Sequence, residues 1–185
     1  MAEVMMGAGG WAALRSTPSQ AVRVTLRDGR RALLRPMTPV DREFYLVGFE
    51  HLGLESRVKR FLGPKPSLSE KEIRYFTDVD HHDHEAIVAV IGHEGTGVAR
   101  FIRDPQQPDV ADVAVAVVDD WQRHGIGSAL LRRLAERARE EGISRLRATM
   151  MWSNTAMLAT LRRLGAPRRT VSTSGGVLEI EITLT

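Results

Sequence analysis

The stretch that decides the fold reads Val117-Val118-Asp119-Asp120-Trp121-Gln122-Arg123-His124-Gly125-Ile126-Gly127-Ser128-Ala129-Leu130. An apolar segment leads into a short polar loop, and glycines then open a long amphipathic segment. The apolar residues of that segment share one helical face, namely Leu131, Leu134, Ala135 and Ala138. This order predicts a strand, a loop and a helix. The first turn of such a helix presents unpaired backbone N–H groups and the positive end of the helix dipole, which suit a phosphate anion.

The glycine spacing excludes two common phosphate-binding motifs. A dinucleotide-binding fingerprint is absent because Leu130 occupies the position of the third glycine. A Walker loop is absent because no Gly-Lys-Ser/Thr follows. Gly125 and Gly127 let a bulky diphosphate approach the backbone without obstruction by a Cβ atom. On the glycines alone, a helix that they merely cap remains an equal alternative.

Length and composition describe one globular domain: 185 residues, of which 43% are apolar and 26% charged. No apolar run approaches the roughly 20 residues of a membrane helix. The first twenty residues lack the basic start and apolar stretch of a signal peptide, so we expect a cytoplasmic protein. The absence of cysteine excludes disulfides, thiolate metal sites and a cysteine nucleophile. We expect a mobile leader over 1–20 and a single domain over 21–185.

Basic residues are abundant but balanced. Only three of the 26 basic residues are lysines, and the net charge is +3. The arginines alternate with acidic residues and form no basic stripe with aromatic residues, so nucleic-acid binding is not expected. His81, His82 and His84 crowd one short loop where adjacent side chains diverge, so we expect a structural or substrate-lip role and no metal.

The remaining elements predict a mixed α/β domain. Strands are expected over 22–26, 31–35, 86–91, 98–102, 112–118, 144–151 and 177–184. The segment 112–118 is nearly all Val and Ala and is expected to be buried on both faces. Four helices are expected: from Thr38-Pro39 to about His51, from a capping box at Ser69 and Glu72 to Phe76, over 125–141, and from Asn154 to Leu164. The residues between the first two helices are expected to form a loop.

The motif Gln122-x-x-Gly125-x-Gly127, with this order of elements, resembles the Gln/Arg-x-x-Gly-x-Gly/Ala motif of the GNAT N-acetyltransferase superfamily. The strand 144–151, Asn154 and the helix before Gly165 are similar to the family's second cofactor motif. The resemblance covers about 160 of the 185 residues. It implies an α/β GNAT fold, with about four helices around a mixed sheet of about six to seven strands. The first half of that sheet would be antiparallel and its central strand splayed.

The resemblance also implies the substrate contacts. Acetyl-CoA would be the co-substrate, with the backbone of Ala116, Val117 and Val118 binding its pantetheine arm. The diphosphate would be held by the motif residues, namely Gln122, Arg123, His124, Gly125, Ile126, Gly127, Ser128 and Ala129. Asn154 would contact the pantetheine arm, with a helix N-cap as the competing role. The pairs Arg132-Arg133 and Arg162-Arg163 are expected to be solvated helix faces, with contact to the adenosine 3′-phosphate as the alternative.

An amine with a pKa near 10.4 is nucleophilic in only about one molecule in 10³ near pH 7, so a proton acceptor is needed. Relatives often use a Glu at the start of the central strand, and the matching position, ten residues before Gln122, is Asp112. We expect Asp112 to act as general base through water, with a plain strand-edge carboxylate as the alternative. The family's tyrosine general acid corresponds to Leu161, which leaves Ser153 or water.

Within the superfamily, Ser56-Arg57, Arg60-Phe61, the segment 69–84 and Trp121-Gln122 resemble bacterial protein lysine acetyltransferases, some of which act on acyl-CoA synthetases. We therefore expect direct transfer of the acetyl group from acetyl-CoA to a protein lysine. The alternatives are a small amine as acceptor, which an acidic cleft would favour, and a non-catalytic acyl-CoA-binding regulatory module. No membrane partner is expected. The sequence does not separate a monomer from a homodimer.

Overall fold

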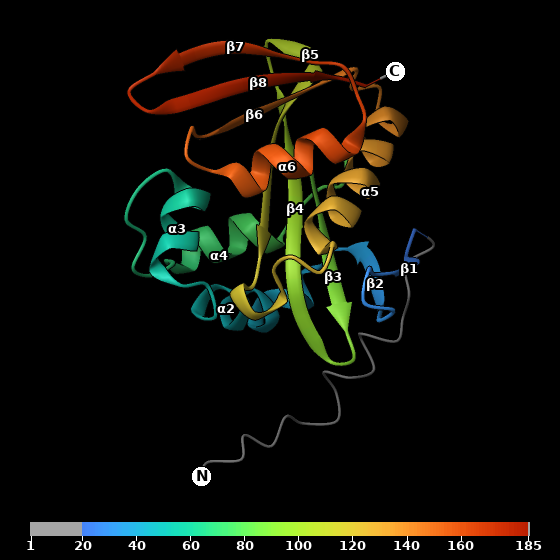
Figure 1. Cartoon of the computed structure of the whole chain (residues 1–185). Coiled ribbons are helices and arrows are strands. Elements are labelled where there is room, and N and C mark those ends of the chain that lie inside the picture. The colour runs from blue at the N-terminus through green and yellow to red at the C-terminus, as the bar shows by residue number, and fades with distance from the viewer. Residues whose placement is uncertain (1–19, 185) are drawn as a thin grey trace.

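The computed structural model describes residues 20–184, so the predicted leader lies outside the described residues apart from its last position. Eight strands form one sheet in this range: β1 (Val22–Thr25), β2 (Arg31–Pro36), β3 (His84–Ile91), β4 (Glu94–Asp104), β5 (Gln107–Val117), β6 (Arg145–Met151), β7 (Arg168–Ser174) and β8 (Val177–Thr183). Their spatial order is β1-β2-β3-β4-β5-β6-β8-β7 (Figure 1). Only the pair β5–β6 is parallel. The predicted mixed sheet with an antiparallel first half is confirmed, with one strand more than expected.

Five α-helices lie on the two faces of the sheet in the described range. They are α2 (Arg42–Glu50), α3 (Leu54–Phe61), α4 (Glu70–Thr77), α5 (Ile126–Glu140) and α6 (Thr155–Leu164), with 3₁₀ turns at Pro39–Asp41 and Asp119–Trp121. Helices α5 and α6 cover one face, and α2, α3 and α4 lie on the other (Figure 1). None of the described helices is long and apolar enough to cross a membrane.

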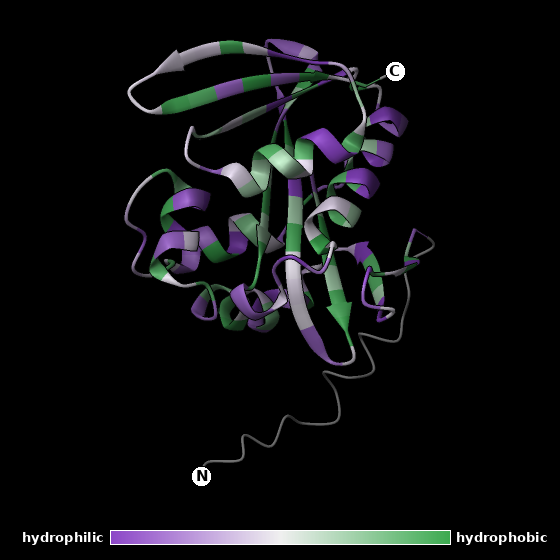
Figure 2. Cartoon of the chain, viewed as in Figure 1, coloured by the Kyte–Doolittle hydropathy of each residue, from purple (hydrophilic) through white to green (hydrophobic). Residues whose placement is uncertain are grey.

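The main core lies between the sheet and α5 with α6. Phe101 of β4 and Leu130 and Leu134 of α5 have no exposed surface. Val113, Val115 and Val117 belong to this core as alternate residues of β5. Their neighbours Asp112, Ala114 and Ala116 therefore face α2–α4. In Figure 2, hydrophilic and hydrophobic residues alternate along α5 and α6, as expected for helices that pack one face against a core.

Two predictions about the elements are wrong. Strand β5 begins earlier, at Gln107, and is not buried on both faces, because Asp112 is exposed and residues 114–117 are only half-buried. Helix α3 occupies part of the predicted loop. Its sequence is rich in charge, and its N-terminus is held by Asp119, whose Oδ2 accepts a hydrogen bond from the Gly53 N–H at 3.0 Å. A contact 66 residues away along the chain leaves no signal in the local sequence.

Candidate active site

The central feature of the site is the point where β5 and β6 part. The two strands pair only from Val110–Arg145 to Asp112–Arg147. Beyond that rung β5 stays with β4 as far as Val117, while β6 stays with β8. The predicted splay of the central strand is therefore present, and the end of β5 leads through a short loop to the N-terminus of α5 (Figure 1).

Backbone direction decides which groups of β5 face the gap. The Val118 N–H donates to the Thr96 carbonyl at 3.0 Å, so it is committed to β4. Because backbone polar groups alternate along a strand, those of Ala116 also point towards β4, and those of Val115 and Val117 point into the gap. Of the three residues predicted to bind pantetheine through their backbone, only Val117 presents its N–H to the gap. Val115, which the sequence reasoning missed, does so as well.

The side chain of Gln122 organises the loop. Its Nε2 lies 3.2 Å from the Val117 carbonyl oxygen, 2.9 Å from Asp119 Oδ1 and 3.2 Å from Ser56 Oγ. These contacts join the end of β5, the loop and α3. The role that the sequence indicated for Gln122 in diphosphate binding stays a prediction, but the amide itself is engaged within the protein.

The loop ends in a left-handed turn that starts α5. Arg123 has φ of 66° and Gly125, the N-cap residue, has φ of 96°. The first helical bond runs from the Ala129 N–H to the Gly125 carbonyl at 3.0 Å. Ala129 therefore belongs to the helix ladder, whereas the N–H groups of Ile126, Gly127 and Ser128 precede it and are open to an anion. The use of this turn for the diphosphate of acetyl-CoA stays a prediction.

His124 lies beside the same turn. Its Nδ1 is buried and has no hydrogen-bond partner among residues 20–184, and its ring packs edge-on to Trp121 at 6.1 Å. Its carbonyl oxygen accepts from the Arg27 N–H at 3.5 Å, which links the loop to the β1–β2 hairpin. A diphosphate contact from the His124 backbone stays a prediction.

The second cofactor motif has a clear structural role. Asn154 caps α6, since its Oδ1 accepts from the Met157 N–H at 3.1 Å. This is the competing role expected for Asn154, and a contact with pantetheine stays a prediction. Leu161 is 1% exposed in the main core, so this position offers no proton donor for the departing thiolate.

Asp112 lies at the closed end of the gap, on the face of β5 that points towards α2–α4. Its side chain is 59% exposed, and its Oδ1 accepts from Arg147 Nε at 2.8 Å. The Nη2 atom of Arg147 donates to Asp104 Oδ2, also at 2.8 Å. These hydrogen bonds raise the pKa of Arg147 and lower that of Asp104. Arg147 is a site residue that the sequence reasoning missed, and nothing in the local sequence indicates it.

The face covered by α2–α4 carries positive charge. Arg100 is 2% exposed and donates to His84 Nε2 at 2.9 Å and to the Phe76 carbonyl at 3.1 Å. Burial lowers the pKa of Arg100 to about 10; burial, assisted by Arg100, lowers the pKa of His84 to about 4. Arg60 lies over the Phe61 ring at 4.9 Å, and burial lowers its pKa as well.

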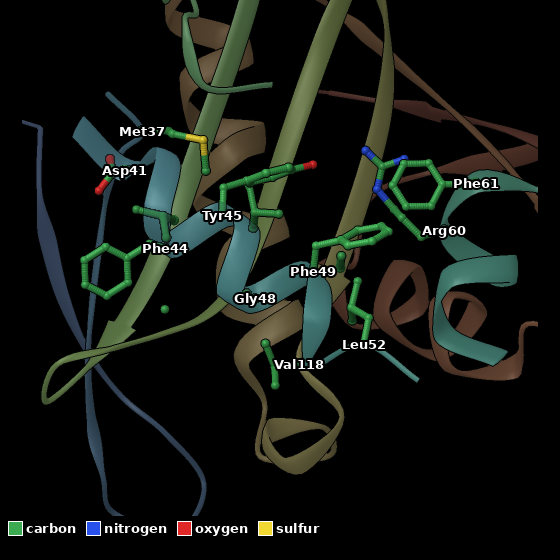
Figure 3. Close-up of a pocket in the computed structure, with 15 residues that line it drawn as sticks. Met37, Asp41, Phe44, Tyr45, Gly48, Phe49, Leu52, Arg60, Phe61 and Val118 are labelled. Atoms are coloured by element: carbon green, nitrogen blue, oxygen red, sulfur yellow. The ribbon is translucent and has the colours of Figure 1, made fainter. Parts of the chain in front are cut away.

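An apolar cavity adjoins this face (Figure 3). Its wall includes aromatic side chains of α2 and α3, together with Ala116 and Val118 from the end of β5. The one carboxylate in the wall, Asp41, is paired with Arg35 at 2.6 Å. The cleft is therefore not acidic.

The histidines at the start of β3 and in the loop before it each contact a different partner. His81 Nδ1 lies 2.8 Å from Glu85 Oε1, and His82 Nδ1 lies 2.6 Å from Glu141 Oε2. No group of three or more His, Asp or Glu side chains within residues 20–184 is arranged to hold a metal ion. The histidine loop thus connects α4 and β3 to the C-terminal end of α5.

Comparison with known proteins places this geometry in a family. The acetyltransferase (GNAT) family matches residues 53–166, which include the gap, the loop and α5. The chain belongs to the GNAT family. Members use acetyl-CoA, so the expected fold, family and class of enzyme, an acetyl-CoA-dependent N-acetyltransferase, are confirmed at this level.

Two curated relatives are similar over most of the chain. The acetyltransferase Pat of Mycolicibacterium smegmatis is 36% identical over 148 residues, which are 78% of this chain and 44% of that protein. The acetyltransferase PA5475 of Pseudomonas aeruginosa is 29% identical over 72% of this chain and 73% of that protein. The chain thus spans less than half the length of the mycobacterial relative.

Solved structures agree with this assignment. The GNAT domain of S. lividans PAT is 34% identical, with a TM-score of 0.85 over 91% of this chain and the whole of that one. A cAMP-binding acyltransferase from Mycobacterium smegmatis is 26% identical, with a TM-score of 0.62 over 98% of this chain and 54% of that one. The similarity supports a Pat-like member of the GNAT family.

Proposed function

We propose that this GNAT chain moves the acetyl group of acetyl-CoA directly to the ε-amine of a protein lysine, with Asp112 as general base. The observation that carries the proposal is the arrangement along β5. Asp112 lies at the closed end of the gap, and the same strand ends five residues later at Val117, beside the N-terminus of α5. At about 3.3 Å per residue, a proton acceptor and an anion-binding turn flank a stretch of about 16 Å.

In the proposed reaction the ammonium form of lysine first loses a proton to Asp112 through a relay of water molecules along β5. The free amine attacks the thioester carbonyl carbon, a C–N bond forms, and the oxyanion accepts a hydrogen bond from the Val117 N–H. Collapse of the intermediate breaks the C–S bond, and the thiolate takes a proton from water. The sequence contains no cysteine, which is consistent with transfer without a cysteinyl intermediate.

The electrostatics favour a protein lysine over a free polyamine or a similar cation. Asp112 and Asp104 share Arg147, and Arg60 and Arg100 lie on the same face without a carboxylate partner among the described residues. A small polycation would meet this positive field at every amine. A lysine on a protein brings a single charge, and its neighbouring residues can supply compensating carboxylates.

The acceptor class is tested by incubating bacterial lysate proteins with the chain and labelled acetyl-CoA, followed by mass spectrometry. We expect label on specific lysines, including those of acyl-CoA synthetases. Label confined to small amines would replace the proposal by the alternative acceptor. Binding of acetyl-CoA without turnover on any acceptor would support the regulatory module.

The role of Asp112 is tested by Asp112→Asn, which we expect to reduce kcat at least about 100-fold with little change in acetyl-CoA affinity. Asp109→Asn is the matched control. Asp109 lies on the same strand, is 51% exposed and pairs with Arg145 at 3.0 Å, but it precedes the gap. Equal activity of the two variants would remove Asp112 from the mechanism.

A further inference from the structure

The cavity in Figure 3 lies next to the proposed site of acetyl transfer. Ala116 and Val118 line it, and Val117, the proposed oxyanion donor, lies between them in the chain. Helix α3 packs beside both β5 and β6, the strands that part at the gap, and its residue Arg60 also lines the cavity. The cavity measures about 50 Å³, which is room for about three to five water-sized groups. A group larger than acetyl therefore fits beside the transfer site.

Most of the cavity wall is apolar and includes three phenylalanines, but one end is polar. Figure 3 shows the Tyr45 hydroxyl group and the Arg60 guanidinium group directed towards one another at that end. The one carboxylate in the wall, Asp41, is already paired with Arg35. A matching occupant is thus apolar along most of its length and carries a hydrogen-bond acceptor or a negative charge at its tip.

A second arginine lies close to this polar end. The guanidinium group of Arg100 lies 4.6 Å from the centre of the Phe76 ring, and that of Arg60 lies 6.0 Å from the same ring. The Nε atom of Arg100 is buried and has no hydrogen-bond partner within residues 20–184, and neither arginine has a carboxylate partner in that range. Two neighbouring cations removed from water are costly without a counter-charge, because buried charges are normally paired. This arrangement favours an anionic ligand.

We propose that the chain also uses acyl-CoA donors whose acyl group ends in a carboxylate, such as succinyl-CoA. The methylene groups of the acyl chain occupy the apolar part of the cavity. The terminal carboxylate binds the Arg60 guanidinium group in a charge-assisted hydrogen bond, close to the charge of Arg100. Acetyl has no group that reaches Arg60, so this residue selects between donors. The inference rests on the proposed use of acetyl-CoA at the same site.

Transfer of the longer acyl group follows the same steps as transfer of acetyl. The lysine loses a proton towards Asp112, its free amine attacks the thioester carbonyl carbon, and a C–N bond forms. The C–S bond then breaks, and the CoA thiolate takes a proton from water. The terminal carboxylate of the acyl group is unchanged, so the modified lysine carries a negative charge in place of its positive one.

The test is calorimetric titration of the full chain with succinyl-CoA and with 4-methylpentanoyl-CoA, whose acyl group has the same branched shape but no charge. We expect the wild type to bind succinyl-CoA at least about tenfold more tightly than the neutral analogue. Arg60→Gln removes the charge and should reduce this preference to less than about twofold. Arg60→Lys keeps a charge without the planar fork and should retain a preference of about threefold.

Lys59→Gln is the matched control, because Lys59 is the neighbouring cation on α3, pairs with Glu55 and does not line the cavity. Its preference for succinyl-CoA should equal that of the wild type. In bacterial lysate, labelled succinyl-CoA and the chain should modify lysines that labelled acetyl-CoA also modifies, as read by mass spectrometry.

The results that contradict this inference differ from those that contradict the proposed function. Equal affinity of the wild type for the two analogues, an unchanged preference in Arg60→Gln, or acetylation of lysines without succinylation would overturn the inference and leave the proposed function intact. No binding of acetyl-CoA by the folded wild type would refute the proposed function itself.

Discussion

The two glycines of the loop provide a test in which one substitution stabilises the fold and the other destabilises it. Gly127 lies in the first turn of α5, and a Cβ there would meet Val117, Thr160 and Val115 at 3.6–3.8 Å, which is ordinary contact. Gly127→Ala should therefore raise the free energy of unfolding by about 0.5–1 kcal/mol, because alanine loses less entropy in a helix. Gly125 has φ of 96°, so Gly125→Ala should cost about 1–2 kcal/mol.

For a domain of this size, those values correspond to a Tm about 1–4 °C higher for Gly127→Ala and about 2–8 °C lower for Gly125→Ala. The assay is thermal unfolding by circular dichroism, with acetyl-CoA affinity measured by calorimetry. Because the Cβ at position 127 points towards β5 and α6, we expect the acetyl-CoA affinity of Gly127→Ala to differ from that of the wild type by less than about twofold. In Gly125→Ala the turn must shift away from its positive φ, so the affinity for acetyl-CoA should fall at least about tenfold.

Gly125→Asn is the control for backbone strain, since asparagine tolerates a positive φ better than alanine and should lose less stability. The reasoning would be refuted if Gly127→Ala lost acetyl-CoA affinity as strongly as Gly125→Ala, because its Cβ would then face the ligand. A stability gain in Gly125→Ala would also refute it.

Three further outcomes are expected. Arg147→Gln removes the Nε donor that holds the Asp112 carboxylate at the closed end of the gap, so kcat should fall about tenfold while acetyl-CoA affinity stays unchanged; an unchanged kcat would separate Arg147 from catalysis. Asp41→Asn leaves the Arg35 charge buried without its partner and should lower the free energy of unfolding by about 3–5 kcal/mol, as measured by urea denaturation. His84 has its pKa lowered to about 4, so the unfolded chain binds the extra proton first and stability should fall as pH drops from about 6.5 to 4. His84→Gln should flatten that part of the stability profile, and an unchanged slope would contradict the assignment.

Most of the fold could be predicted because its signals are local. Helix α5 has an apolar stripe, and α4 begins with the capping box at Ser69, whose hydroxyl lies 3.3 Å from the Glu72 N–H. Turns at Gly29 and Gly92 join β1 to β2 and β3 to β4 as hairpins. Helix α3 was missed because its N-terminus depends on a distant residue, Asp119. The burial of β5 was overestimated because an apolar strand beside a gap has the same sequence pattern as a strand in the middle of a closed sheet.

The loop motif and the position of Asp112 were also visible in the sequence, because both lie on one continuous segment. The partners of those residues were not. Arg147 reaches Asp112 from the neighbouring strand, Ser56 reaches Gln122 from α3, and Arg27 reaches the turn from the N-terminal hairpin. No spacing rule relates such pairs, since they meet only when separate elements lie in register.

The sequence by itself determined the class of chemistry. Glycines after a strand and before an amphipathic helix allow an anion-binding turn, the order of elements around them indicates the GNAT family, and the absence of cysteine excludes a cysteinyl intermediate. Only the tertiary structure decided which groups are free to act. Val118 gives its N–H to Thr96 while the backbone of Val117 faces the gap, and Asp112 shares an arginine whereas Arg60 and Arg100 have no carboxylate partner within the described chain. The reason is physical. A residue's type fixes which hydrogen bonds and charges it can offer, but the neighbours that folding brings to it decide which of those groups are already paired.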